Sequence, residues 1–213
     1  VDAIESHGLI FVTQDTPIGR GALEGLDEIT DLLTPDQSIF SSNETTSDVN
    51  WKLNMEANLE GLHIKTTHPE SFFPYGFDNL TILESFGNNS RVTFPFRRIE
   101  KLRGTPVEAR NVSGQLTYVY HLFPNVAIAV LSNHTSVTIS EPLTTTSTRF
   151  VTYRMTNSGE ETNEANLTRA KRDAGFLADT GSQEDADRHR VRRRSWQHAR
   201  PGLPGQHCSR RRL

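Results

Sequence analysis

The sequence predicts an α+β fold in which helices cover one antiparallel sheet. Three observations support this prediction: helical spacing of apolar residues at 51–63, a run of β-branched and aromatic segments between residues 79 and 155, and turn-forming residues between those segments. A polar segment at 160–171, helical or loop, follows the strands. Helices before and after an uninterrupted run of strands favour a layered fold built on a meander.

The strongest helical segment runs from residue 51 to residue 63. Its apolar side chains recur at helical spacing, so we expect them to face the core. They are Trp51, Met55, Leu59 and Leu62. We expect Ser47 or Asp48 to cap the first turn of this helix.

Two segments at the start of the chain are also apolar. Residues 22–33 carry apolar side chains at helical spacing, and Pro35 ends that segment. Ser6–Thr13 is a short apolar run that reads as a buried strand. A domain seldom opens on a buried strand, so we expect residues 1–15 to be the remnant of a preceding domain.

Six strands are expected in the middle of the chain. They are Thr81–Phe86, Ser90–Phe96, Gln115–Leu122, Val126–Leu131, Ser136–Glu141 and Arg149–Met155. Turn-formers such as Gly87-Asn88-Asn89 separate them, which is typical of sequential antiparallel pairing.

Composition narrows the function classes. With 213 residues, 34% hydrophobic and 23% charged, the chain is long enough for one sizeable globular domain. No apolar run approaches the ~18 residues of a membrane span, and no signal peptide is visible, so we expect a cytoplasmic protein. Cys208 is the single cysteine, which excludes an internal disulfide and any cysteine-held cluster or zinc site within one chain.

The net charge of −3 hides an uneven distribution. Residues 188–213 hold nine arginines and no acid, with no hydrophobic period, so we expect a disordered basic tail. We hypothesise that this tail is a frameshift, since a shifted reading frame can encode an apolar helical pattern there. Sequencing the gene and weighing the intact protein test that hypothesis.

Glu60, His63 and His68 carry the chemistry of the chain, at the spacing E-x2-H-x4-H. Residues three apart share a helix face, whereas residues five apart on an unbroken helix would point roughly 140° from each other. The two histidines can therefore bind one metal only if the helix ends between them. The β-branched pair Thr66-Thr67 and Pro69 permit such an ending.

Two imidazoles and one carboxylate with open positions suit non-haem Fe(II) that activates O2. The spacing alone is weak evidence, because the chain has eight histidines and ordinary histidines can produce it by chance.

Longer matches single out one family. The segment resembles the start of the catalytic domain of Rieske-type non-haem oxygenases, the large or alpha subunits of aromatic-ring-hydroxylating dioxygenases. The matching residues are Asn50, Trp51, Lys52, Glu56, Glu60, His63, His68 and Pro69. Phe123-Pro124-Asn125 and Gly8–Val12 resemble two further segments of that family. The resemblance covers roughly residues 6–187 and implies a helix-grip (Bet v1-like or START-like) fold with a long iron-bearing helix.

The resemblance also implies roles for individual residues. His63 and His68 would be iron ligands, and Asp187 or Asp185 in an acidic run would be the third, with Asp187 preferred. Glu60 matches a catalytic acid that hydrogen-bonds toward the ligands and bridges to the cluster of a neighbouring subunit. By the same resemblance, a glutamate at this point occurs in relatives that act on carnitine- or choline-like compounds.

By the same resemblance, residues 16–187 form a catalytic domain that binds Fe(II) and hydroxylates an aromatic or small amine-type substrate with O2. The electrons would come from a 2Fe-2S Rieske cluster, which this chain cannot hold with one cysteine. A ferredoxin or reductase would feed that cluster, and the family usually forms homotrimers. We therefore expect no turnover by the chain alone.

Three other interpretations were weighed. A metal-free helix-grip ligand-binding protein, or a decayed and inactive oxygenase fragment, shares the fold without the chemistry. A secreted glycoprotein is suggested only by six N-x-S/T sequons. A nucleic-acid binder would use the basic tail, but the acidic body opposes it, so we expect neither nucleic-acid nor membrane partners.

Overall fold

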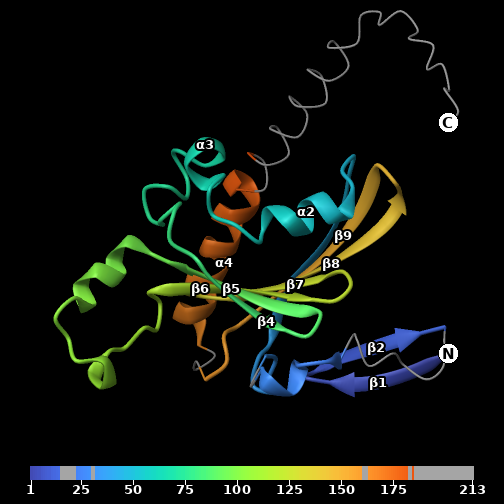
Figure 1. Ribbon diagram of the computed structural model, residues 1–213, viewed down its shortest axis with the longest axis horizontal. Coiled ribbons are helices and arrows are strands. Elements are labelled where there is room, and N and C mark those ends of the chain that lie inside the picture. Colours follow the sequence, from blue (N-terminus) through green and yellow to red (C-terminus); the bar gives the residue numbers. More distant parts are fainter. Residues whose placement is uncertain (15–22, 30–31, 160–162, 182–183, 185–213) are drawn as a thin grey trace, which may run out of the picture.

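The computed structural model describes residues 1–14, 23–29, 32–159, 163–181 and 184. The core of the fold is a seven-stranded antiparallel sheet with the strand order β3-β9-β8-β7-β6-β5-β4 (Figure 1). Its strands are β3 (Ile39–Ser47), β4 (Ile82–Phe86), β5 (Asn89–Pro95), β6 (Leu116–Leu122), β7 (Val126–Val130), β8 (Thr135–Thr144) and β9 (Ser147–Met155).

The six expected strands are confirmed as the meander β4 to β9. Strand β3, which pairs with β9 at one edge of the sheet, was not expected from the sequence. Its sequence, Ile-Phe followed by seven polar residues, has no apolar alternation, because an edge strand with exposed side chains needs none.

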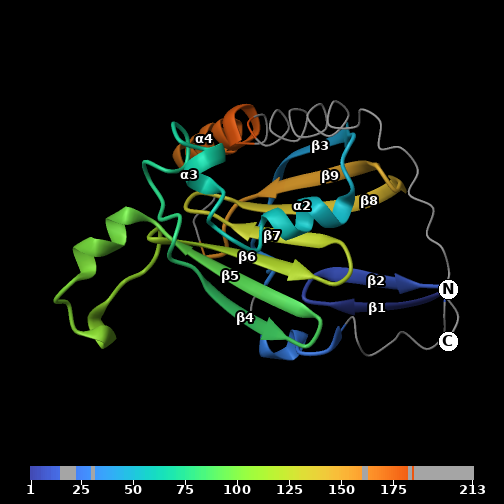
Figure 2. The same cartoon turned by 45° about the horizontal axis from the view of Figure 1, so that its top comes forward.

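Three helices lie on one side of the sheet, and a two-stranded hairpin lies on the other (Figures 1 and 2). The helices are α2 (Trp51–Ala57), α3 (Ile64–Thr67) and α4 (Glu164–Phe176), which runs on into a π-helical turn at Leu177–Gly181. Single 3-10 turns lie at Leu26–Glu28, Arg97–Leu102 and Val107–Ala109. Within the described residues, no helix is long and apolar enough to cross a membrane.

The hydrophobic core lies on the hairpin side of the sheet. Leu26, Ile29 and Leu32 are at most 4% exposed and pack against strand residues such as Leu122 and Ile128. Of the expected helix over residues 22–33, the described part is helical only at Leu23 and in one 3-10 turn that begins after Gly25, so a continuous helix is wrong there. Gly25 has φ +75°, and a Cβ there would meet the backbone of Phe86, so the chain turns at this point instead of continuing as a helix.

The hairpin corrects another expectation. It consists of β1 (Asp2–Ser6) and β2 (Leu9–Thr13), so the apolar run is a strand. It is not buried, however: Ile10 is 73% and Val12 is 63% exposed, while Leu9 and Phe11 pack against the core. A two-stranded hairpin has one face against the core, and its other face is left uncovered.

The helix expected at 51–63 is shorter than its apolar stripe suggested. It ends at Ala57, and Leu59 and Leu62 are exposed instead of facing the core. The cap is also different, since the Asn50 side chain, not Ser47 or Asp48, accepts a hydrogen bond from the Lys52 N–H. The long iron-bearing helix is therefore replaced by two short helices with a turn between them.

The sheet face below the helices carries small and polar side chains. Residues paired directly across antiparallel strands share a face, and one such row crosses the sheet. It comprises Ser90, His121, Ala127, Thr138, Thr152 and Asn43. A second row on the same face includes Ser136, Arg154 and Ser41.

His121 on that face is a buried polar residue without hydrogen bonds to its ring among the described residues. It is 7% exposed, and neither ring nitrogen has a hydrogen-bond partner within the described part of the chain. Burial lowers the pKa of His121 from 6.5 to about 4, because the charged ring would lose its hydration.

This burial predicts a loss of stability in mild acid. The unfolded chain binds a proton near pH 6.5 while folded His121 stays neutral, so stability falls as pH falls from 6.5 toward 4. Between pH 6.5 and pH 5 the contribution is about 2 kcal/mol. Urea unfolding of the iron-free chain should show this extra loss in the wild type relative to His121→Leu. Parallel pH profiles for the two proteins would contradict it.

Candidate metal centre

The turn between α2 and α3 brings the two histidines of the motif together. His63 directly precedes α3, and His68 directly follows it with φ −119° and ψ 46°, outside the helical region. The helix thus ends between them, as expected from Thr66-Thr67 and Pro69. The two rings lie 5.5 Å apart between centroids at an interplanar angle of 68°. Five residues of separation therefore do not keep the rings apart.

Each ring has its Nδ1 against a carboxylate. Nδ1 of His63 lies 2.6 Å from Oε1 of Glu60, and Nδ1 of His68 lies 2.7 Å from Oε2 of Glu184. A metal-binding histidine commonly donates one ring N–H to a carboxylate, which fixes the ring and its tautomer and makes the other nitrogen the ligand. A metal here would be held through Nε2 of both rings.

Glu60 also organises the turn itself. Its carboxylate accepts hydrogen bonds from the backbone N–H groups of Leu62 and His63, the latter at 3.2 Å. The same side chain thus fixes the start of α3 and the orientation of the His63 ring. The resemblance implied that Glu60 hydrogen-bonds toward the iron ligands. In the structure it contacts Nδ1 of His63, on the side of the ring away from Nε2.

The surroundings of His68 are closed. The residue is 1% exposed, and the Phe72 ring lies 4.6 Å from its own ring between centroids. Glu184 also accepts a hydrogen bond from Oγ of the buried Ser71 at 2.5 Å. Phe72 contacts Phe176 at the end of α4, 6.1 Å between centroids, so the helix and the histidine loop pack together.

A buried histidine holds α4 over the sheet. His134, in the turn between β7 and β8, is 1% exposed and has Nδ1 3.1 Å from Oδ2 of Asp173 on α4. This contact positions the helix whose C-terminal continuation leads to Glu184.

The predicted third ligand lies outside the described residues, so its assignment stays a prediction. This holds for both Asp185 and Asp187, and among the residues described no group of three or more histidine, cysteine, aspartate or glutamate side chains could hold a metal ion. Glu184 was not singled out by the sequence analysis. The only sequence signal for it was its place in the acidic run that holds the two aspartates.

The described residues fit the two-histidine part of an iron site. The two imidazoles converge, each has its Nδ1 against a carboxylate, and the loop that carries His68 packs against α4 through Phe72. The protein-family model described as ring hydroxylating alpha subunit (catalytic domain) matches residues 36–193 of this chain. The chain belongs to this family.

Solved structures of Rieske oxygenases share the fold. The quaternary ammonium Rieske monooxygenase CntA, in complex with an inhibitor, has a TM-score of 0.66 at 16% identity over 87% of this chain. Naphthalene 1,2-dioxygenase from Rhodococcus sp., bound to indole, has a TM-score of 0.63 at 14% identity, also over 87% of this chain. No curated protein matches the chain.

The chain spans about half of these proteins, 48% of the CntA chain and 52% of the dioxygenase chain. The shared fold of these structures confirms the fold class expected from the sequence, an antiparallel sheet with helices of the Rieske-oxygenase catalytic domain. The structures that share the fold include a monooxygenase and a dioxygenase.

Proposed function

We propose that this chain is the iron-binding catalytic portion of a Rieske-type oxygenase that hydroxylates an organic substrate with O2. One observation carries the proposal: two histidine rings 5.5 Å apart, each with its Nδ1 against a glutamate, stand in the motif that the family shares. An ordinary pair of surface histidines has no need of two orienting carboxylates.

The residues of the chain would then divide the work. His63 and His68 hold Fe(II) through Nε2, while Glu60 and Glu184 fix the two rings. The bound iron supplies activation of O2 at its open coordination positions. Phe72 covers the His68 ring and limits access of water from the α4 side. Glu60 is 43% exposed at its side chain, so its outer edge can also face a partner.

The third ligand is proposed to be Asp187, with Asp185 as the alternative. Both follow Glu184 closely, and Glu184 already contacts His68. We expect Asp187→Ala to weaken Fe(II) binding at least tenfold and Asp185→Ala to leave it nearly unchanged, because loss of a direct ligand costs more than loss of an outer contact. Anaerobic titration with Fe(II) measures both. The reverse order of effects would assign the ligand to Asp185.

The electrons are proposed to come from outside the described site. With one cysteine the chain lacks the donor set of a Rieske cluster. One CntA structure is described as giving insight into inter-subunit electron transfer. By analogy we propose a cluster on a neighbouring subunit of a homotrimer, fed by a ferredoxin or a reductase, with residues 1–15 continuing from a Rieske domain. A cytoplasmic location remains a prediction.

Nitric oxide tests the proposed function without any electron donor. The full chain loaded anaerobically with Fe(II) is expected to bind about one iron, and that iron is expected to bind nitric oxide, because two histidines and one carboxylate leave positions open. Electron paramagnetic resonance reports the complex. A folded chain that binds no iron would instead be a metal-free ligand-binding or decayed relative, and iron inert to nitric oxide would contradict an O2-activating site.

A further inference from the structure

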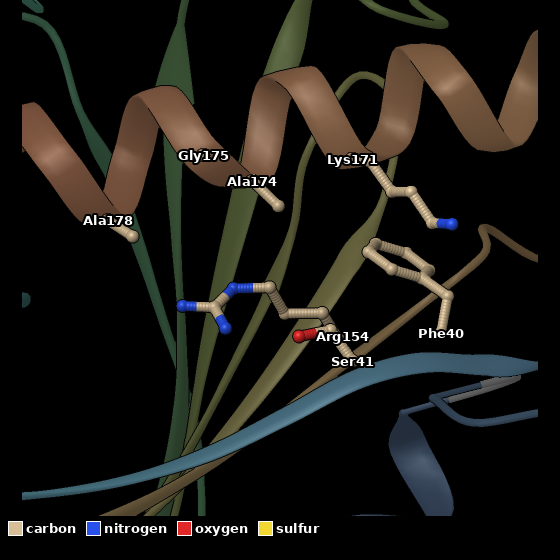
Figure 3. A pocket seen from close by; sticks show the side chains of 7 residues that line it. All are labelled: Phe40, Ser41, Arg154, Lys171, Ala174, Gly175 and Ala178. Carbon is tan, nitrogen blue, oxygen red and sulfur yellow. The ribbon is translucent and has the colours of Figure 1, made fainter.

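A cavity of about 330 Å³ separates α4 from the edge of the sheet formed by β3 and β9 (Figure 3). Its walls are Phe40, Ser41, Arg154, Lys171, Ala174, Gly175 and Ala178. The helix contributes mainly small residues, and the side chains of Ala174 and Ala178 point down into the space. Small side chains on the helix leave room that larger ones would fill.

Arg154 is the central polar group of this cavity. Its side chain extends below α4 toward the Ala178 end, with the Ser41 hydroxyl beside it (Figure 3). One guanidinium nitrogen donates to Oδ1 of Asn43 at 2.6 Å, which is a neutral partner. Within the part of the chain that the structure describes, Arg154 forms no ion pair with a carboxylate.

Partial burial makes this arrangement costly for a cation. Burial lowers the pKa of Arg154 below its ordinary value, and among the described residues no charged neighbour counteracts that effect. By contrast, Arg149 on the same strand lies on the opposite face of the sheet and pairs with Glu141 and Glu44. A partly desolvated guanidinium with donors to spare favours an anion that can accept two parallel hydrogen bonds.

The rest of the wall suits an organic anion. Lys171 adds a second positive charge at the rim, and none of the seven lining residues is acidic. The Phe40 ring and the two alanines provide apolar surface for a carbon skeleton. A bare inorganic anion would leave that apolar surface unused.

The cavity and the packing around the candidate metal centre lie on opposite sides of α4. Ala174 and Ala178 line the cavity, and Phe176 between them contacts Phe72, whose ring lies 4.6 Å from that of His68. Phe176 is two residues from both Ala174 and Ala178, or about 200° around the helix, so the width of α4 separates the cavity wall from the packing around the histidine.

We propose that Arg154 binds the carboxylate of an organic acid in this cavity. The binding needs no iron, so the inference goes beyond the proposed function. Lys171 assists from the rim, while Phe40, Ala174 and Ala178 contact the carbon skeleton. The hydroxyl-rich sheet face next to Arg154 offers further hydrogen bonds to a polar molecule.

Benzoate and its uncharged analogue benzamide test the inference on the iron-free full chain. We expect benzoate to bind with a Kd below about 10 mM. Benzamide should bind at least about tenfold more weakly, because it lacks the charge that pairs with the guanidinium. NMR or calorimetric titration measures both. Using iron-free protein excludes direct coordination of benzoate to the metal, so failure here leaves the iron site untouched, and failure of iron binding leaves this result untouched.

The variants locate the site. Arg154→Gln is expected to weaken benzoate binding about tenfold or more, and Lys171→Gln only severalfold, because Lys171 is exposed. Arg149→Gln removes the same charge from the same strand on the other face and should leave binding unchanged. Thermal melts check that each variant folds. No benzoate binding, equal loss in Arg149→Gln, or phosphate binding as tightly as benzoate would each overturn the proposal.

Discussion

Replacing His63 by Ala is expected to abolish stoichiometric iron binding by the chain, and replacing His68 is expected to do the same. Each substitution removes one of two imidazoles whose rings lie 5.5 Å apart, and the remaining ligands cannot hold Fe(II) against exchange with water. Anaerobic Fe(II) titration followed by desalting and metal analysis gives the iron retained per chain. The wild type should retain about one iron and both variants essentially none.

His63 and His68 need different substitutions because the burial of their side chains differs. The His63 side chain is 28% exposed, so alanine there leaves no large cavity, whereas the His68 side chain is 2% exposed. His68→Gln keeps a side chain that can still donate to Glu184, and it serves beside His68→Ala in case the latter unfolds. His7→Ala, outside the candidate site, is the matched control. Iron retained by a folded His63→Ala chain would refute the assignment of that residue.

Replacing Glu184 by Gln is expected to weaken Fe(II) binding about 10- to 100-fold without removing a ligand. The carboxylate lies against Nδ1 of His68 and accepts the hydroxyl of Ser71, so it fixes the ring and increases the electron density on Nε2. An amide retains the shape but loses the charge. The measurement is the Fe(II) dissociation constant under anaerobic conditions.

A nearby acid provides a control that separates the effect of orienting the His68 ring from the effect of net charge. Glu70 lies two residues after His68 and is exposed, so Glu70→Gln changes the charge near the site by the same amount. Glu60→Gln is expected to resemble Glu184→Gln, because Glu60 holds the other ring in the same way. Equal weakening by Glu70→Gln would show that the effect is general electrostatics.

The sheet was largely predictable from local sequence, and the helices were not. Strands β4 to β9 are rich in β-branched and aromatic residues and are separated by turn-formers, so the local sequence indicates each of them. Leu59 and Leu62 continue the helical spacing of α2, yet the chain turns at Asn58 and leaves both exposed. Periodicity records only which positions are apolar, whereas the Glu60 bonds to the Leu62 and His63 backbone organise the turn that follows α2 and the start of α3.

The candidate site, like the fold, could be predicted from the sequence only in part. The ending of a helix between His63 and His68 could be predicted because β-branched residues and a proline act locally. The contact of His68 with Glu184 could not, because it joins residues 116 positions apart through the packing of α4. The same holds for Arg154, whose role depends on which strand lies beneath the helix and on the absence of an ion pair among the described residues.

Anomalous diffraction at the iron edge, from crystals of the full chain grown or soaked with Fe(II) under anaerobic conditions, tests the central claim most directly. We predict one strong peak about 2.1 Å from Nε2 of both His63 and His68. Nδ1 of each ring should remain against Glu60 and Glu184 in the same map. A map with iron at another place, or with ordered His63 and His68 rings and no iron between them, would contradict the account.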